Sequence, residues 1–187
     1  MNEENNNFKI DTKYIEEKYK HIKTLKKTID DNLVVTEFTD ENVELNDLLV
    51  KIFVLSIGSY FEKETLRILA AIYKHHIHSE ALYFHIHKEI LSDKFFKLFD
   101  FKEKNINKFF SFYGNDFKES MKKYRNQDSS FMTSEANFLQ LINSRNIFAH
   151  EDIIKVSNPT TIDDYHQYAL DSVKMLNETF ENLLTHP

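Results

Sequence analysis

Glycine and proline are almost absent from this sequence, with only two of each among 187 residues. Sandwiches and barrels need many tight turns, and such turns favour these two residues. The shortage therefore indicates long helices with short connections. We expect an all-α fold with a single domain, residues 11–187, preceded by a disordered tail at residues 1–10.

The composition also excludes several classes of chemistry. With two glycines, the chain has no Gly-rich loop to cradle a phosphate, so it lacks a Walker motif and a dinucleotide-binding fingerprint. Cysteine is absent, which removes disulfides, thiolate zinc sites and cysteine nucleophiles. We expect no cofactor and no metal, and the cytoplasm is the expected compartment.

Hydropathy and charge limit the partners. No apolar run reaches the roughly 18–20 residues of a membrane span, and no signal peptide is recognisable, so no membrane contact is expected. The net charge is −6, but residues 151–187 hold seven acids against two lysines, which leaves residues 1–150 near balance. Any contact with RNA is therefore local. Lysines gather at residues 13–27, 88–108 and 118–125, where solvated helix faces are the simpler interpretation.

Apolar periodicity and capping residues predict the helices. A segment at 41–76 is apolar round most of its circumference, which is typical of a central helix. Ser56, Gly58 and Ser59 in its middle would let another helix approach closely. The other expected helices are 11–30, 80–99, 104–113, 115–125, one from Thr133 or Ser134 to His150, and a last one opened by Thr161.

The helix that ends at His150 places a charge among apolar residues. Taking about 100° per residue, its core stripe consists of Phe138, Leu141, Ile142, Phe148 and Ala149. Arg145 falls in the middle of this stripe, where a guanidinium stays charged and must find acceptors. Glu62 occupies a similar place on the central helix. We therefore expect a buried Arg145–Glu62 ion pair, with Glu64 as the second choice.

His150 falls elsewhere on the same helix, on a polar flank near Asn143 and Asn146. An ideal helix turns Arg145 and His150 about 140° apart. Either the helix ends or bends near Ala149, or a working site combines residues from two copies of the chain. A structural interpretation is also open, in which Arg145 is a core ion-pair residue and His150 is favoured at the helix end by the macrodipole.

The segment Arg145-Asn146-x-x-x-His150 resembles the R-[polar]-x-x-x-H signature of HEPN domains. Phe148-Ala149 before the histidine match as well, and the central helix carries Tyr60-Phe61-Glu62. The resemblance covers about residues 40–185 and is strongest to the RiboL-PSP-type branch. It implies a HEPN-type helical bundle with a long central helix and with the motif on the penultimate helix.

The resemblance also implies an activity, that of a metal-independent endoribonuclease whose motif helices pair in a homodimer. In that scheme His150 is the general base or acid for attack of the ribose 2′-OH on the adjacent phosphate. Arg145 stabilises the phosphorane, Asn146 positions the histidine or the phosphate, and Glu62 supports Arg145. The products are a 2′,3′-cyclic phosphate and a 5′-hydroxyl. Such families often act as toxins or anti-phage defence effectors, with an antitoxin or defence protein as partner.

Other functions remain open at this point. The chain would also fit a HEPN domain that has lost catalysis and serves as a dimerising scaffold or partner-binding module, or an unrelated helical adaptor. The acidic Glu151-Asp152 beside the motif would repel a phosphodiester. No tyrosine lies two residues after His150, so silencing by nucleotidylation at such a tyrosine is not indicated.

Two further clusters have both a functional and a structural interpretation. Zinc or nickel would suit a dense group of histidines, but no HExxH spacing occurs and a helix end with a loop is favoured. The group consists of His75, His76, His78, His85 and His87. Lysine and phenylalanine are interleaved at 94–99 and 108–110, a pattern that can stack single-stranded bases. Core or interface packing is the favoured interpretation of these phenylalanines.

Overall fold

The computed structural model of the chain describes residues 8–32, 39–91, 95–101, 103–150 and 160–185. Within these ranges every regular element is a helix, and β-bridge pairing is limited to one isolated bridge between Asp100 and Asn105. The all-α prediction is confirmed. Among the described residues, no helix combines the length and the apolar character needed to cross a membrane.

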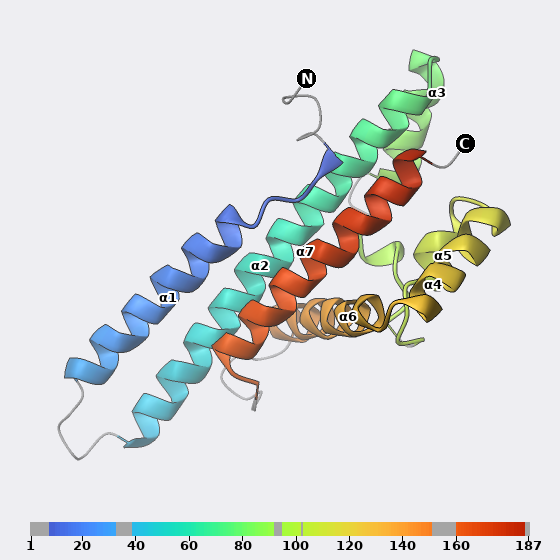
Figure 1. The fold of residues 1–187 in the computed structure, drawn as a ribbon. Helices are drawn as coiled ribbons and strands as arrows, with labels where there is room; N and C mark the ends of the chain where they lie inside the picture. The colour runs from blue at the N-terminus through green and yellow to red at the C-terminus, as the bar shows by residue number, and fades with distance from the viewer. Residues whose placement is uncertain (1–7, 33–38, 92–94, 102, 151–159, 186–187) are drawn as a thin grey trace.

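Three long helices run side by side with nearly aligned axes (Figure 1). They are α1 (Lys13–Asn32), α2 (Thr39–His76) and α7 (Ile162–Thr185). At 38 residues, α2 is the long central helix that the sequence indicated, and it contacts α1, α6 and α7. The motif helix α6 (Ser129–His150) crosses α2 and α7 at a steep angle and packs against both. The motif therefore lies on the penultimate helix, as expected.

The segment between α2 and α6 differs from the expectation of one helix over 80–99. The α-helix α3 spans only Glu80–Ile86, and a π-helical turn at His87–Leu91 and a 3₁₀ turn at Phe95–Lys97 follow. None of the α3 residues is buried, whereas Phe95 and Phe99 are fully enclosed. The prediction of one long helix was wrong because burial of these two rings draws the chain into the core.

The next two helices are close to the expectation. The helix α4 (Asn107–Ser111) is shorter than expected, and α5 (Asn115–Gln127) is slightly longer. Helix α6 begins earlier than Thr133 or Ser134, because Asp128 is its cap: Asp128 Oδ1 accepts hydrogen bonds from the backbone N–H groups of Ser130 and Phe131. An acceptor in this position satisfies donors that the first helical turn leaves unpaired.

Helix α7 begins with the cap that the sequence indicated. The backbone N–H of Asp164 donates to Thr161 Oγ1 at 3.1 Å, and the backbone N–H of Thr161 donates to Asp164 Oδ2 at 3.0 Å. This reciprocal arrangement is a capping box with aspartate in place of glutamate. Asp163 and Asp164 also place negative charge at the positive end of the helix dipole.

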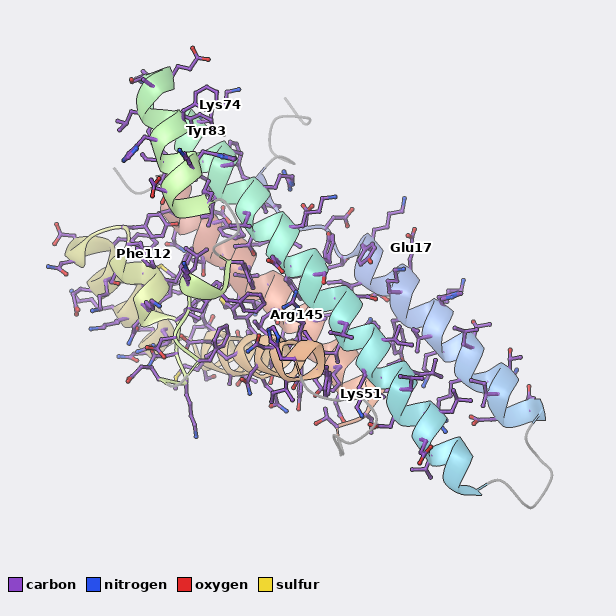
Figure 2. All side chains as sticks on the ribbon, turned by 180° about the vertical axis from the view of Figure 1, so that it is seen from behind. Glu17, Lys51, Lys74, Tyr83, Phe112 and Arg145 are labelled. Atoms are coloured by element: carbon purple, nitrogen blue, oxygen red, sulfur yellow. The ribbon has the colours of Figure 1, made fainter. Side chains whose placement is uncertain are left out.

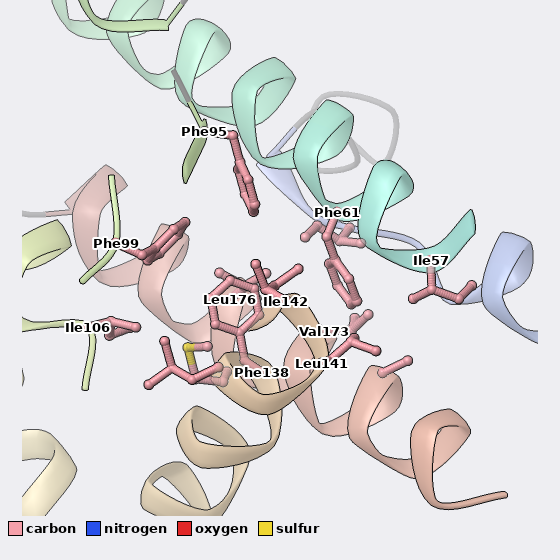
Figure 3. Packing of buried hydrophobic residues seen from close by; sticks show 14 of the residues in the cluster. Ile57, Phe61, Phe95, Phe99, Ile106, Phe138, Leu141, Ile142, Val173 and Leu176 are labelled. Carbon is pink, nitrogen blue, oxygen red and sulfur yellow. The ribbon is translucent and has the colours of Figure 1, made fainter. Parts of the chain in front are cut away.

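Aromatic rings fill the core where α6 meets α2 and α7 (Figure 3). Phe138 on α6 makes edge contacts with Phe61 on α2 and Phe99, with centroid separations of 6.2 Å and 5.1 Å. Such edge contacts suit the quadrupoles of the rings. Phe95, Phe99, Phe109 and Phe110 are all buried. The structural interpretation of the lysine–phenylalanine clusters is therefore confirmed for the described residues, and Lys94 lies outside them.

Packing begins before the expected domain boundary at residue 11. Ile10 is buried, its backbone N–H donates to Asn177 Oδ1 at 2.7 Å, and its carbonyl accepts from Asn177 Nδ2. These contacts tie the chain ahead of α1 to α7. Of the expected tail, residues 1–7 lie outside the described residues.

Candidate functional site

Arg145 lies on the face of α6 that packs against α2, where its Nη2 is 3.2 Å from Glu62 Oε2. The Arg145–Glu62 ion pair expected from the helical angles is present. It is not fully buried, since the side chains of Arg145 and Glu62 are 17% and 29% exposed. The guanidinium is therefore held by the core and still open to solvent at one edge.

Two further residues fix the arginine. Gly58 on α2 makes room for it, because a Cβ at this position would fall 2.8 Å from Arg145 Cβ. Phe96, in the 3₁₀ turn, lies against the guanidinium with its ring centroid 4.6 Å from Arg145 Cζ. A ring at this distance attracts the cation and limits its rotation. Gly58, Phe96 and Glu62 together hold Arg145. Figure 2 shows Arg145 where α6 crosses α2.

The guanidinium keeps unused hydrogen-bonding capacity. It has five N–H donors, and within the described part of the chain the only hydrogen bond it makes is the one to Glu62. Arg145 Nε is buried and has no partner there. An arginine with free donors and a fixed orientation is suited to bind a phosphate or another anion.

Helix α6 continues without interruption to His150, its last residue. His150 is exposed, Asn146 is partly buried, and Phe148 is buried. The rest of the predicted core stripe is also buried except Ala149, which is exposed. No bend near Ala149 turns the histidine back, and the described residues show no contact between His150 and Arg145.

Two contacts from other helices anchor the end of the motif helix, and the sequence did not indicate either of them. Lys51 on α2 is 1% exposed, pairs with Asp47, and has its Nζ 5.8 Å from the centre of the Phe148 ring. Tyr165 on α7 donates a hydrogen bond to Ser144 Oγ at 2.8 Å. The sequence signals for these two contacts were only a lysine within an apolar run and a tyrosine near the start of a helix. Both contacts limit movement of the motif backbone.

The structure has the pattern that the resemblance implied: the motif lies on α6, and its arginine pairs with Glu62 on the long central helix α2. A family model described as RiboL-PSP-HEPN matches residues 5–186. The chain belongs to this family. Membership excludes the alternative of an unrelated helical adaptor. No curated protein and no solved structure matches this HEPN chain.

The remaining clusters gain no functional support from their geometry. Among the described residues, no three or more histidine, cysteine, aspartate or glutamate side chains are grouped so that they would hold a metal ion. Several lysines of the basic stretches are paired with acids at the surface, such as Lys23 with Asp163 and Lys122 with Glu119. Glu151-Asp152, which the sequence placed beside His150, lies outside the described residues.

Proposed function

We propose that this HEPN-family protein is a metal-independent endoribonuclease. The 2′-oxygen of a ribose attacks the adjacent phosphorus, and the bond from phosphorus to the 5′-oxygen breaks. His150 takes the 2′-hydroxyl proton or delivers a proton to the leaving 5′-oxygen, since an imidazole exchanges protons near neutral pH. Arg145 stabilises the charge of the phosphorane, and Asn146 positions the histidine or the phosphate. The products are a 2′,3′-cyclic phosphate and a 5′-hydroxyl.

The observation that carries this proposal is the fixed orientation of Arg145. Glu62 accepts one of its hydrogen bonds and Phe96 covers the guanidinium, while free donors and solvent access remain. Electrostatic catalysis depends on donors that are already oriented before charge develops. An arginine that served only as a surface charge would not need a glycine and an aromatic ring to hold it.

We further propose that the working site forms in a homodimer through the α6 helices. The support is geometric: α6 stays helical to His150, and on a regular helix the two motif side chains diverge by about 140°. Pairing of two α6 helices about a two-fold axis would place the histidine of one chain near the arginine of the other. One cleft would then contain both pairs, and each pair, made of the arginine of one chain and the histidine of the other, would form one of two sites.

Mixing two inactive variants tests this arrangement. Arg145→Ala and His150→Ala chains are each expected to be inactive toward RNA, with melting temperatures that show them to be folded. If a site takes Arg145 from one chain and His150 from the other, a mixed dimer holds one intact site. Co-refolding the two variants in equal amounts should restore about a quarter of the wild-type activity, since half of the dimers are mixed and have one site of two.

The outcomes separate the two parts of the proposal. A mixture as inactive as either variant alone would overturn the shared site. A monomer at working concentrations, measured by light scattering, would do so as well. If wild-type protein cleaves no RNA from a broad pool in the presence of a chelator, the metal-independent endoribonuclease itself is overturned. An Asn143→Ala variant, which changes an exposed residue of the same helix, is the matched control.

A toxin or anti-phage defence role, with an antitoxin or defence protein as partner, completes the proposal. Induced expression in a bacterium is expected to arrest growth, and Arg145→Ala and His150→Ala should each relieve the arrest.

The second candidate is a non-catalytic HEPN scaffold, which the pairing of Arg145 with Glu62 favours because the arginine already has a structural partner. Harmless expression and intact RNA, together with a stable dimer, would support the scaffold.

A further inference from the structure

Lys51 is a charged residue enclosed in the core beside the end of the motif helix. It lies on α2, and its side chain is 1% exposed. A lysine is seldom enclosed to this degree unless it is paired, because the ammonium group loses its hydration on burial. Its Nζ pairs with Asp47, one helical turn earlier on α2, whose side chain is 25% exposed. The pair therefore holds a positive charge at a fixed place inside the fold.

The charge of Lys51 lies beside the last turn of α6. Its Nζ is 5.8 Å from the centre of the Phe148 ring, a distance at which the ring attracts a cation. In Figure 2, Lys51 lies farther toward the start of α2 than Arg145 does. The last carbonyl groups of a helix have no partner within it and form the negative end of the helix dipole, which a nearby cation stabilises. Lys51 supplies such a cation to α6.

Phe148 is the last buried residue of α6. Its side chain is 3% exposed, whereas Ala149 and His150, which end the helix, are exposed. Terminal turns of helices fray when few buried contacts hold them. The position of the His150 imidazole therefore depends on how firmly Phe148 is held two residues earlier.

The two motif side chains have separate supports. Glu62 and Phe96 hold Arg145, and neither of these contacts involves Lys51. Lys51 contacts Phe148, on the His150 side of the motif. A change at Lys51 should therefore disturb the histidine and leave the arginine in place.

We propose that Lys51 is a positioning residue for His150. It acts through Phe148: its charge stabilises the last turn of α6, and this turn sets where the imidazole meets the RNA. Lys51 does not touch the substrate, since its side chain is enclosed. The proposal rests on the endoribonuclease function proposed above. A residue needed only for stability could be apolar here, because apolar replacements of buried ion pairs are often neutral or stabilising.

Hydrogen exchange tests the structural half of this proposal without RNA. Lys51→Met keeps a long unbranched side chain and removes the charge. The amides of residues 148–150 are expected to exchange on the order of tenfold faster in this variant, because the last turn loses its cation. The amide of Phe138, in the buried middle of α6, reports global stability and should change less. Unchanged exchange in the last turn, or equal acceleration along the whole of α6, would overturn the proposal.

Two further variants complete the set. Lys51→Met leaves Asp47 without its partner, so the double variant with Asp47→Asn removes the remaining charge and protects the fold. A folded double variant whose last turn exchanges as in wild type would also overturn the proposal. Lys26→Met on α1 removes a lysine that pairs with Asp30, four residues away, and is the control. It should leave exchange in α6 and RNA cleavage unchanged.

Steady-state cleavage of RNA tests the functional half. Lys51→Met is expected to lower kcat on the order of tenfold, since a displacement of about 1 Å at a catalytic group can cost about a hundredfold. KM should stay close to that of wild type, because Arg145 keeps its contacts with Glu62 and Phe96. An unchanged kcat would overturn the positioning role, whether or not KM rises.

Mixed dimers assign the effect to one chain. In the mixture of Arg145→Ala and His150→Ala chains, the Arg145→Ala chain supplies the histidine of the intact site. Lys51→Met added to this chain should lower the restored activity about tenfold, whereas Lys51→Met added to the His150→Ala chain should leave that activity unchanged. Equal losses in the two mixtures would show a general effect on folding and overturn the proposal.

Failure of the earlier proposals is distinguishable from failure of this one. If wild type cleaves RNA but the mixture of Arg145→Ala and His150→Ala chains does not, the shared site is overturned, and the exchange and kcat measurements decide the role of Lys51. If wild type cleaves no RNA, the endoribonuclease is overturned and the positioning role with it. Cleavage by wild type together with an unaffected Lys51→Met variant would overturn only the role of Lys51.

Discussion

Gly58 on α2 lies so close to Arg145 on α6 that no side chain fits between them. A Cβ at residue 58 would fall 2.8 Å from Arg145 Cβ and closer still to Arg145 Cγ. The approach of the two helices at this point brings the guanidinium within reach of Glu62, one helical turn along α2. Of the small residues that the sequence placed in the middle of the central helix, Gly58 is the one that makes room for the motif arginine.

Substitution of Gly58 by alanine is expected to displace Arg145. The added methyl group must push against the arginine side chain, so Gly58→Ala should lower the free energy of unfolding by about 1–3 kcal/mol, although alanine favours the helix. Denaturant titration measures this loss. In the double variant with Arg145→Ala, the contact with Arg145 Cγ is removed and only the contact with Cβ at residue 145 remains, so the cost of Gly58→Ala should be clearly smaller. Strictly additive effects would contradict the contact. Ser59→Ala, at an exposed neighbour, is the control.

Removal of Glu62 should leave the arginine without its acceptor. Glu62→Ala is expected to cost about 1–3 kcal/mol of unfolding free energy, because the guanidinium is only 17% exposed and water replaces the carboxylate poorly. A double-mutant cycle with Arg145→Ala measures the coupling. The surface pair of Lys26 and Asp30 is the comparison, and Asp30→Ala should cost about 0–1 kcal/mol. A near-wild-type melting temperature for Glu62→Ala would contradict a stabilising pair.

Glu135 on α6 should make stability depend on pH. Burial raises the pKa of its carboxyl above the usual 4.5. Two contacts lower the pKa but do not cancel this effect: Glu135 Oε1 accepts the backbone N–H of Ile106 at 2.8 Å and lies 3.5 Å from Arg125 Nη1. The folded protein therefore holds this proton more tightly than the unfolded chain does. The resulting stabilisation is complete below pH 4.5 and is lost as the pH rises through the folded pKa.

Urea titrations of wild type and Glu135→Gln between pH 4 and 8 would measure this effect. Wild type should lose stability relative to the variant as the pH rises through that window, since glutamine carries no charge to bury. The difference in unfolding free energy is therefore expected to change with pH in one direction only. A constant difference across the range would contradict the raised pKa.

The capping box of α7 should contribute to stability independently of the motif. Thr161→Ala removes the acceptor for the backbone N–H of Asp164 and is expected to cost about 1 kcal/mol. Thr161→Ser keeps a hydroxyl in the same place, so its melting temperature should stay close to that of wild type. Equal losses for both substitutions would show that the hydroxyl hydrogen bond is not responsible.

The sequence by itself determined the secondary structure class, the central helix, the motif and the partner of Arg145. Helix formation depends on neighbouring residues, so it can be predicted along the chain from three features: the scarcity of glycine and proline, the apolar periodicity and the capping residues of α7. Glu62 was identifiable because an arginine on an apolar stripe requires an acceptor, and the central helix offers one on a matching stripe. The spacing of Arg145 and His150 carried the resemblance to the family, and the family model that matches residues 5–186 showed membership.

Only the tertiary structure decided how the segments meet. Residues 80–99 did not form one helix, because burial of Phe95 and Phe99 in the core outweighs the local preference for continuing it. Phe96 reaches Arg145, and Lys51 reaches Phe148, across gaps of nearly 50 residues or more in the sequence. Periodicity reports which face of one helix is buried, but not which residue of another segment covers it, since that depends on the crossing of the helices.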